Sequence, residues 1–241
     1  MKRRSLLFAA GAGVLGVTVL SACSSPAEPA PGSSAPPPGS PPGSPAAPTG
    51  WERVNLGFVS AYLLVRGSEV AIVDLGTSGS EAGIGEGLKA AGSGWANVKH
   101  VILTHRHDDH VGGLSGVQPQ VKATWYAGEA DVSGIRSETA LKPVKDGDEI
   151  FGLRIIGTPG HTAGHVSVFD PATGVLVAGD ALRTTDGLVG SDPQYTLDPA
   201  QAAASVKKLA GLDIKQILPG HGDPLTAGSA DALKKLAATV R

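Results

Sequence analysis

A run of 27 residues, 24–50, divides this chain of 241 residues into two unequal parts. Pro, Ser, Ala and Gly make up the whole run except Glu28 and Thr49, and it holds ten of the chain's 18 prolines. Such a segment has almost no apolar bulk to bury, so we expect a disordered linker there. One globular domain is therefore expected, formed by residues 51–241, which are enough to bury a substantial core.

An export signal is predicted at residues 1–22. A basic start precedes an apolar run that is too short for a membrane span of about 20 residues, and small residues follow it. The sequence Leu-Ser-Ala-Cys that ends at Cys23 resembles the lipobox of bacterial lipoproteins, in which the cysteine becomes the first mature residue and carries lipid. The alternative is a plain signal peptide that contains a cysteine. Arg3 and Arg4 partly resemble a twin-arginine signal, so that route and the general secretory route both stay open.

Lipid on Cys23 would anchor the exported protein to the outer face of the bacterial cell membrane, with residues 23–50 as its linker. Without residues 1–22 the chain holds 17 basic and 22 acidic residues, a net charge of −5, and no basic run. This composition gives no support to nucleic-acid binding. Cys23 is the one cysteine, so no disulfide can form within the chain. We expect a membrane contact through the lipid, a small-molecule substrate and no nucleic-acid partner. The oligomeric state stays open.

The first part of the domain has the pattern of two strands and a helix. Residues 56–65 and 69–74 are rich in β-branched and other apolar residues and are separated by a turn. Residues 80–91 follow a glycine-rich loop and predict a helix. A last helix is expected at residues 231–239.

The strongest local signal is the sequence Thr-His-Arg-His-Asp-Asp-His at residues 104–110, which follows an apolar stretch typical of a buried strand. Side chains two positions apart on an extended segment point the same way, so His105 and His107 can converge on one metal ion. Asp109 and His110, after the chain turns, can face a second ion. The alternative is a solvated polar turn without a metal.

Three later apolar stretches also lead into glycine-containing loops. The first leads to His161, the second to Asp180 and the third to His221. Glycine beside each of these residues lets the backbone turn sharply and approach an ion closely. A lone histidine or aspartate at a strand end is more often structural than a ligand. Together with the first cluster, however, these three residues complete two coordination shells.

These motifs resemble those of the metallo-β-lactamase superfamily of hydrolases over about residues 54–225. The resemblance implies an α/β fold, a four-layer αβ/βα sandwich of two mostly antiparallel sheets with helices outside and the site at one edge. It also implies a ligand set for two metals. The first would be held by His105, His107 and His161, the second by Asp109, His110 and His221, with Asp180 as the bridge.

Three further polar residues have expected places. Asp74 matches an acidic position that in the family supports the metal-binding loop, so it is expected to contact ligands rather than metal. His165 matches a histidine that the family repeats without using it as a ligand, and the same indirect role is expected. His100 has no partner in the sequence pattern, and we expect it at the surface.

Two divalent ions bridged by Asp180 and a solvent molecule would make a hydroxide nucleophile at neutral pH. We assign Asp109 and Asp180 as the catalytic carboxylates. Histidine and carboxylate ligands without thiolate suit Zn²⁺ best, and Fe or Mn would be tolerated.

Several sequence features argue against particular branches of this family. Asp180 and the lack of a cysteine ligand weigh against β-lactam hydrolysis, and His107 replaces the Glu of flavo-diiron oxygen reductases. Glyoxalase II carries a C-terminal glutathione-binding domain, whereas 20 residues follow His221. The RNA-processing members need large insertions and a basic surface, and this sequence has neither.

We therefore predict a metal-dependent hydrolase of a lactone, thioester or other carboxylic ester at the cell surface. Residues 182–197 are expected to form the pocket wall, where Arg183 and Tyr195 could contact substrate. The alternatives are an iron-dependent oxidoreductase resembling persulfide dioxygenases and a non-catalytic metal-binding lipoprotein.

Overall fold

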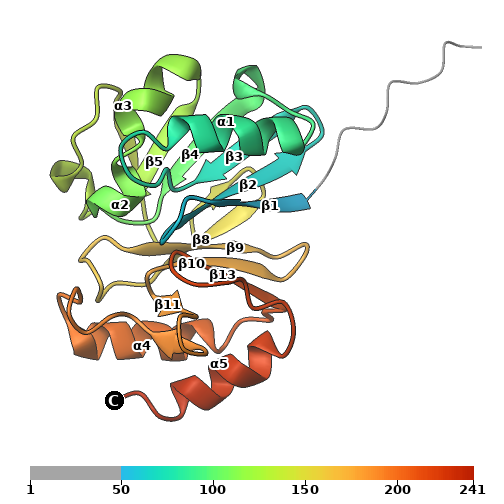
Figure 1. Cartoon of the computed structure of the whole chain (residues 1–241). Helices are drawn as coiled ribbons and strands as arrows, with labels where there is room; N and C mark the ends of the chain where they lie inside the picture. Colours follow the sequence, from blue (N-terminus) through green and yellow to red (C-terminus); the bar gives the residue numbers. More distant parts are fainter. Residues whose placement is uncertain (1–49) are drawn as a thin grey trace, which may run out of the picture. The chain divides into compact units, whose positions relative to one another are not determined.

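The computed structural model describes residues 50–241, which form two β-sheets packed face to face with helices on both outer sides (Figure 1). These layers agree with the predicted αβ/βα sandwich. The export signal, Cys23 and residues up to 49 of the predicted linker lie outside the described residues. Strand β1 begins at Gly50, the last residue assigned to that linker. Among the residues described, none of the helices is long and apolar enough to cross a membrane.

The first sheet combines both pairing directions. Strands β1 to β3 are antiparallel, whereas the three pairings from β3 to β6 are parallel. The expectation of a mostly antiparallel sheet is therefore wrong for this sheet. Long connections carry the chain back across the sheet after β3, β4 and β5, and such crossovers produce parallel neighbours. In sheet order the strands are β1 (Gly50–Asn55), β2 (Ser60–Arg66), β3 (Glu69–Val73), β4 (Val98–Leu103), β5 (Thr124–Gly128) and β6 (Leu141–Val144).

The second sheet is antiparallel except at one pairing. Strands β7 to β10 follow one another as antiparallel neighbours, and β13 joins β10 in parallel because helix α4 lies between them in the chain. A two-stranded hairpin of β11 (Leu182–Arg183) and β12 (Val189–Gly190) stands beside this sheet. The strands of the main sheet are β13 (Gln216–Pro219), β10 (Val175–Gly179), β9 (Val166–Asp170), β8 (Leu153–Gly157) and β7 (Glu149–Ile150).

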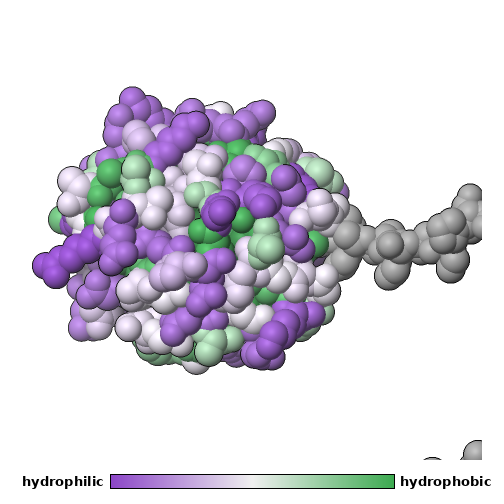
Figure 2. Space-filling model, turned by 90° about the horizontal axis from the view of Figure 1, so that it is seen from above, coloured by the Kyte–Doolittle hydropathy of each residue, from purple (hydrophilic) through white to green (hydrophobic). Residues whose placement is uncertain are grey.

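Three apolar clusters fill the spaces between the four layers. In β2, Leu63 belongs to the cluster on the helix side, whereas its neighbour Leu64 belongs to the cluster between the sheets. Helix α1 buries Ile84 and Leu88, one turn apart, against the first sheet. Seen from above, this face of the domain mixes hydrophilic and intermediate residues with small separate apolar groups (Figure 2). The helices are α1 (Glu81–Ala90), α2 (Asp108–Val111), α3 (Leu114–Val117), α4 (Pro199–Leu209) and α5 (Ser229–Ala237).

Two local predictions are wrong. The strand predicted over residues 56–65 starts too early, because residues 57–59 bend around Gly57, whose φ of +96° breaks the extended backbone, and β2 begins at Ser60. His100 is half-buried rather than on the surface. It lies in β4, an inner strand of the first sheet, with its ring centroid 5.0 Å from that of Phe151.

Asp170, at the end of β9, connects the two sheets through a buried carboxylate. It accepts hydrogen bonds from Trp51 Nε1 of β1 at 3.2 Å and from Thr173 Oγ1 at 2.8 Å, and it pairs with Arg66 Nη2 of β2 at 2.8 Å. Burial raises the pKa of Asp170, but these partners outweigh it and hold the pKa below its usual value.

Asp170→Ala is expected to lower the free energy of unfolding by about 3 kcal/mol at pH 7, because it leaves the partly buried Arg66 without its partner. A carboxyl with a depressed pKa stabilises the fold above its unfolded pKa, and this contribution is lost as the pH falls below about 4. Urea unfolding of the unaltered protein and of Asp170→Ala should therefore give a smaller difference in the free energy of unfolding at pH 3 than at pH 7. An equal difference at both values would contradict this assignment.

Candidate metal centre

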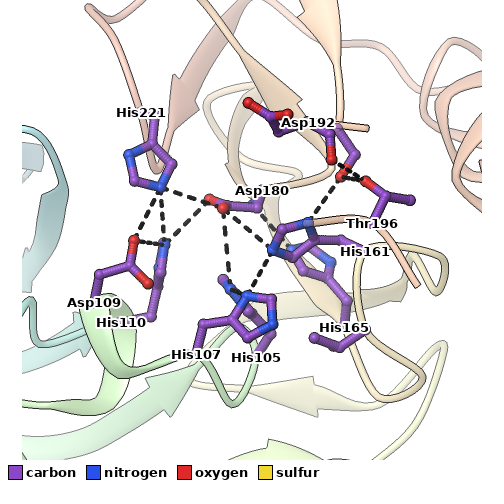
Figure 3. Close-up of polar contacts among 12 residues, drawn as sticks. His105, His107, Asp109, His110, His161, His165, Asp180, Asp192, Thr196 and His221 are labelled. Carbon is purple, nitrogen blue, oxygen red and sulfur yellow. Dashed lines mark hydrogen bonds and ion pairs between the residues drawn. The ribbon is translucent and has the colours of Figure 1, made fainter. Parts of the chain in front are cut away.

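The predicted ligands meet at one edge of the two sheets, where β4, β8, β10 and β13 end. Residues 104–110 leave the end of β4, and their last ligands stand on α2, which begins at Asp108. His161 follows β8, Asp180 follows β10 directly, and His221 follows β13. Four loops that are distant in sequence thus bring seven potential ligand side chains into one cluster (Figure 3).

The first group of three contains His105, His107 and His161. Nδ1 of His107 lies 3.1 Å from Nε2 of His105 and 2.9 Å from Nε2 of His161. His105 and His161 are buried, whereas His107 is half-buried. Three ring nitrogens therefore converge on one point that opens toward solvent on the side of His107.

The second group of three contains Asp109, His110 and His221. Nε2 of His221 lies 3.5 Å from Nε2 of His110 and 3.2 Å from Oδ2 of Asp109. Oδ2 of Asp109 is also 3.7 Å from Nε2 of His110. Two nitrogens and one carboxylate oxygen thus converge on a second point.

Asp180 stands between the two groups (Figure 3). Its Oδ2 lies 3.3 Å from Nε2 of His161 and 3.3 Å from Nε2 of His221, and its Oδ1 lies 3.2 Å from Nε2 of His110. The backbone at Gly220 approaches this carboxylate so closely that a Cβ there would lie 2.4 Å from Oδ1. Glycine at position 220 therefore leaves room for the shared carboxylate.

Asp74 orients one histidine from each group. Its Oδ2 accepts hydrogen bonds from Oγ1 of Thr104 at 2.7 Å and from Nδ1 of His110 at 2.8 Å. Since the Thr104 hydroxyl donates to Asp74, it accepts from Nδ1 of His105, 3.0 Å away. Nε2 of both histidines then faces the centre, and that of His105 is free of hydrogen. Burial opposes charge on His110, but Asp180 and Asp74 outweigh it and raise its pKa well above the usual value, so a metal ion would displace a proton from its Nε2. Asp74 itself has a φ of +61°, a left-handed conformation that aspartate tolerates.

His161 is oriented by a second relay, which comes from the loop after β12. Its Nδ1 lies 2.9 Å from Oγ of Ser191, and that oxygen lies 2.8 Å from Oγ1 of Thr196. Thr196 donates its hydroxyl hydrogen to the carbonyl of Asp192. Ser191 therefore donates to Thr196 and accepts from Nδ1 of His161, which leaves Nε2 of His161 as a free lone pair. The backbone N–H of Leu197 donates to the His161 carbonyl at 3.1 Å and fixes the same loop.

Ser191→Ala is expected to weaken metal binding at the first group by about 10–100-fold, because a ligand histidine loses the partner that orients it. Competition with a chelator measures this affinity. Ser133→Ala, at an exposed position, is the control and should bind metal like the unaltered protein. An affinity within twofold of that control would show that the relay does not position His161.

Asp131 is a further buried carboxylate, and no pattern in the sequence pointed to it. It accepts hydrogen bonds from the backbone N–H of Arg106 at 3.1 Å, from the Thr162 hydroxyl and from the backbone N–H of Gly164 at 3.0 Å. It therefore ties the loop of His105 and His107 to the loop of His161. Ser191 and Thr196 were missed for the same reason: only the folded chain brings them to the site.

His165 lies beside the two groups rather than in them. Its Nε2 accepts the backbone N–H of Asp180 at 3.0 Å, and its Nδ1 donates to Oγ1 of Thr158 at 2.8 Å. Burial, together with the nearby His161, lowers the pKa of His165 to about 3, so the ring is neutral. It holds the backbone that presents Asp180.

The two groups differ in electrostatics. Burial lowers the pKa of His161 to about 4 and also lowers the pKa of His105 and His107, so the first group offers neutral nitrogens at pH 7. Burial opposes charge on His221 as well, but Asp109 and Asp180 outweigh it and raise the pKa of His221 to about 10. A metal ion at the second group would therefore displace protons.

The donor chemistry fits two divalent ions. In the first group, His105 and His161 carry their hydrogens on Nδ1, so each turns a lone pair on Nε2 toward Nδ1 of His107, at 3.1 and 2.9 Å. A neutral His107 has one ring hydrogen and can donate it to only one of them. Between the two groups, Oδ1 of Asp180 is buried and makes no hydrogen bond of good geometry, although Nε2 of His110 lies 3.2 Å away. Metal ions would satisfy both groups, and ligands of nitrogen and oxygen alone match the preference of zinc, iron or manganese.

A pocket of about 810 Å³ opens over the centre. The segment 182–197 contributes Arg183, Thr185, Asp192 and Tyr195 to its lining, which agrees with the prediction that this segment forms the wall. Phe58, from the bend before β2, also lines the pocket, and its carbonyl accepts from Nδ1 of His221 at 2.8 Å. A volume of this size suits a small-molecule ligand.

Comparisons with known proteins agree with this geometry. The family profile described as the metallo-beta-lactamase superfamily matches residues 54–221. The hydroxyacylglutathione hydrolase of Acidiphilium cryptum (strain JF-5) is 35% identical over 67% of this chain and 63% of that enzyme. The probable metallo-hydrolase YflN of Bacillus subtilis (strain 168) is 30% identical over 59% of this chain and 71% of that protein.

A solved structure is also similar. The crystal structure of a metallo-beta-lactamase family protein from Thermus thermophilus has a TM-score of 0.63 and 25% identity, and the match covers 78% of each chain. The family profile covers more than half of the present chain and includes Asp180 and every residue of the two groups. The chain therefore belongs to the metallo-β-lactamase superfamily.

Proposed function

We propose that this protein is a dinuclear metallohydrolase that cleaves a lactone, a thioester or another carboxylic ester. The observation that carries the proposal is the position of Asp180, whose Oδ2 lies 3.3 Å from one histidine of each group. A carboxylate in this position suits two ions that share a ligand. The similarity to hydroxyacylglutathione hydrolases, which are named for a thioester reaction, supports the bond type.

Each of the seven residues has a proposed role in metal binding. His105, His107 and His161 would hold the first ion, and Asp109, His110 and His221 the second, with Asp180 shared. When bound, two such ions lower the pKa of a water molecule and polarise the carbonyl of the substrate. Zn²⁺ is the proposed metal, because the donors are nitrogen and oxygen without thiolate.

Asp109 is placed for proton transfer. Its side chain is about 27% exposed and lines the pocket, whereas that of Asp180 is about 11% exposed. Solvent and substrate can therefore reach Asp109 more easily. We assign Asp109 the role of taking a proton from the attacking water and passing it to the leaving group.

A panel of simple lactones, thioesters and aryl esters, assayed with the zinc-loaded full-length chain, tests the proposal. Hydrolysis of at least one class that is lost in His107→Ala is the expected result. Oxygen uptake by an iron-loaded preparation would instead indicate an oxidoreductase. Two bound metals without turnover of any substrate would indicate a metal-binding protein.

We also propose that the protein is exported and held to the outer face of the cell membrane by lipid on Cys23. The support is the sequence pattern around this cysteine. Labelling with radioactive palmitate in a bacterial host should mark the unaltered protein and not Cys23→Ala. Equal labelling of the two would contradict the anchor.

A further inference from the structure

The pocket over the metal centre contains one lysine or arginine side chain among its described lining residues, and this is Arg183. Its Nη1 lies 2.8 Å from Oδ2 of Asp192, which lines the same pocket. About 25% of the Arg183 side chain and 32% of the Asp192 side chain are exposed. The two opposite charges therefore neutralise each other in the pocket wall. Arg183 is not available to pair with an anionic group of a substrate.

The backbone holds this ion pair in place. Arg183 is in β11, where its Nε donates to the carbonyl of Gly190 in β12 at 3.3 Å. Asp192 lies just after β12, and its Oδ1 accepts the backbone N–H of Gln194 at 2.9 Å. Both charged groups thus have a second contact that fixes them, so turning Arg183 toward a substrate would break a preorganised arrangement.

Apart from the candidate metal ligands and this ion pair, the charged residue among the described lining residues is Asp108, and its charge is negative. Asp108 is exposed and lines the pocket. Arg106 and Arg136 line a different, adjoining hollow of about 460 Å³, which shares Asp108 and Gly112 with the pocket. A carboxylate at the end of a substrate chain would therefore find no unpaired lysine or arginine among the described lining residues, and the negative charge of Asp108 would repel it.

The pocket also presents apolar surface. Phe58 and Tyr195, both lining residues, are 65% and 60% exposed, and Leu197, on the same loop as Tyr195, is 64% exposed. The ring of Phe58 stacks on that of His221 at 6.0 Å between centroids. Phe58 and Tyr195 thus offer apolar surface to the chain of a substrate bound in the pocket.

We propose that Arg183 and Asp192 form a specificity-determining pair that makes this centre select esters with an uncharged, apolar acyl chain over esters whose chain ends in a carboxylate. The inference rests on the proposed function and narrows its substrate class. An ester whose chain ends in a carboxylate would bind weakly because its charge has no partner, whereas an apolar chain needs none. A binding site can be specific through such an unfavourable interaction with the wrong ligand as well as through contacts with the right one.

The test compares two aryl esters of equal chain length, 4-nitrophenyl hexanoate and the 4-nitrophenyl monoester of adipic acid. The hexanoate chain ends in a methyl group, and the adipate chain ends in a carboxylate. The zinc-loaded protein is expected to prefer the hexanoate by about tenfold or more in kcat/KM. Asp192→Asn keeps the shape of the side chain but frees Arg183, so the ratio should fall to about one.

Two variants control this result. Adding Arg183→Gln to Asp192→Asn should restore the preference for the hexanoate, because the freed cation is removed. Asp146→Asn removes the partner of Lys208, outside the pocket lining, and should leave the ratio unchanged. An unchanged ratio in Asp192→Asn, or a wild-type protein that hydrolyses both esters equally, would overturn the proposal. A preference for the adipate that disappears in Arg136→Gln would also overturn it and place the carboxylate in the adjoining hollow.

Binding separates this inference from the proposed function. Hexanohydroxamic acid and the monohydroxamic acid of adipic acid carry the same metal-binding group and the same two chain ends. Calorimetry with the zinc-loaded protein should give about tenfold tighter binding of the former, and a smaller ratio in Asp192→Asn. This ratio decides the inference even if no ester is hydrolysed, an outcome that would contradict only the proposed function.

Discussion

Asp180→Ala is expected to lower kcat/KM for any ester substrate by at least about 10³-fold, equivalent to about 4 kcal/mol of lost transition-state stabilisation. The side chain lies between the two groups of ligands, with its Oδ2 at 3.3 Å from His161 and from His221. Its removal separates the two ions from their shared ligand. The variant should therefore bind one zinc per chain tightly and lose the second.

The measurement combines metal content with steady-state kinetics on the same preparation. Asp213→Ala is the matched control, because Asp213 is exposed and lies outside both the pocket lining and the segment 182–197. It should retain two metals and full activity. If Asp180→Ala kept two tightly bound zinc ions and activity within about tenfold of the control, Asp180 would not be the shared ligand.

Asp74→Asn is expected to weaken both metal sites together, by about 10–100-fold in affinity. It should also lower the free energy of unfolding of the metal-free protein by about 3 kcal/mol. Three buried donors point at this carboxylate: the backbone N–H of Thr104, the Thr104 hydroxyl and Nδ1 of His110. Asparagine keeps the size and tolerates the left-handed backbone, but its amide NH₂ must face at least one of these donors.

Chelator competition and urea unfolding check this prediction, with the exposed Asp213→Asn as the control. Thr104→Val provides a second test. It breaks the relay from Asp74 to His105 but leaves the bond from Asp74 to His110, so it should weaken mainly the first site. Equal loss at both sites in Thr104→Val would mean that Asp74 acts by general destabilisation rather than by orienting single histidines.

The convergence of the candidate ligand side chains could be predicted partly from local spacing and partly from family resemblance. His105 and His107 stand two positions apart at the end of a strand, and glycine lies next to Asp180 and His221. The four-layer arrangement came from family resemblance rather than from the strand pattern. The pairing directions of the first sheet could not be predicted, because they depend on how each connection crosses the sheet.

The residues that orient the ligands had no local signal. Asp131 stands in an ordinary polar segment, and its role depends on contacts with Arg106 and Gly164, 25 and 33 positions away in the sequence. Ser191 lies 30 positions from His161. The burial of His100 was missed for the same reason, because its ring is covered by side chains from other strands and loops. Contacts of this kind are formed only by the folded chain.

The central claim is that two metal ions act together on one ester bond, and a metal titration tests it most directly. Metal-free full-length protein is loaded with zinc in small steps, and the rate of ester hydrolysis is measured at each step. The rate should stay low up to one equivalent, rise between one and two equivalents, and level off at two. A rate that reaches its maximum at one equivalent would contradict the dinuclear centre.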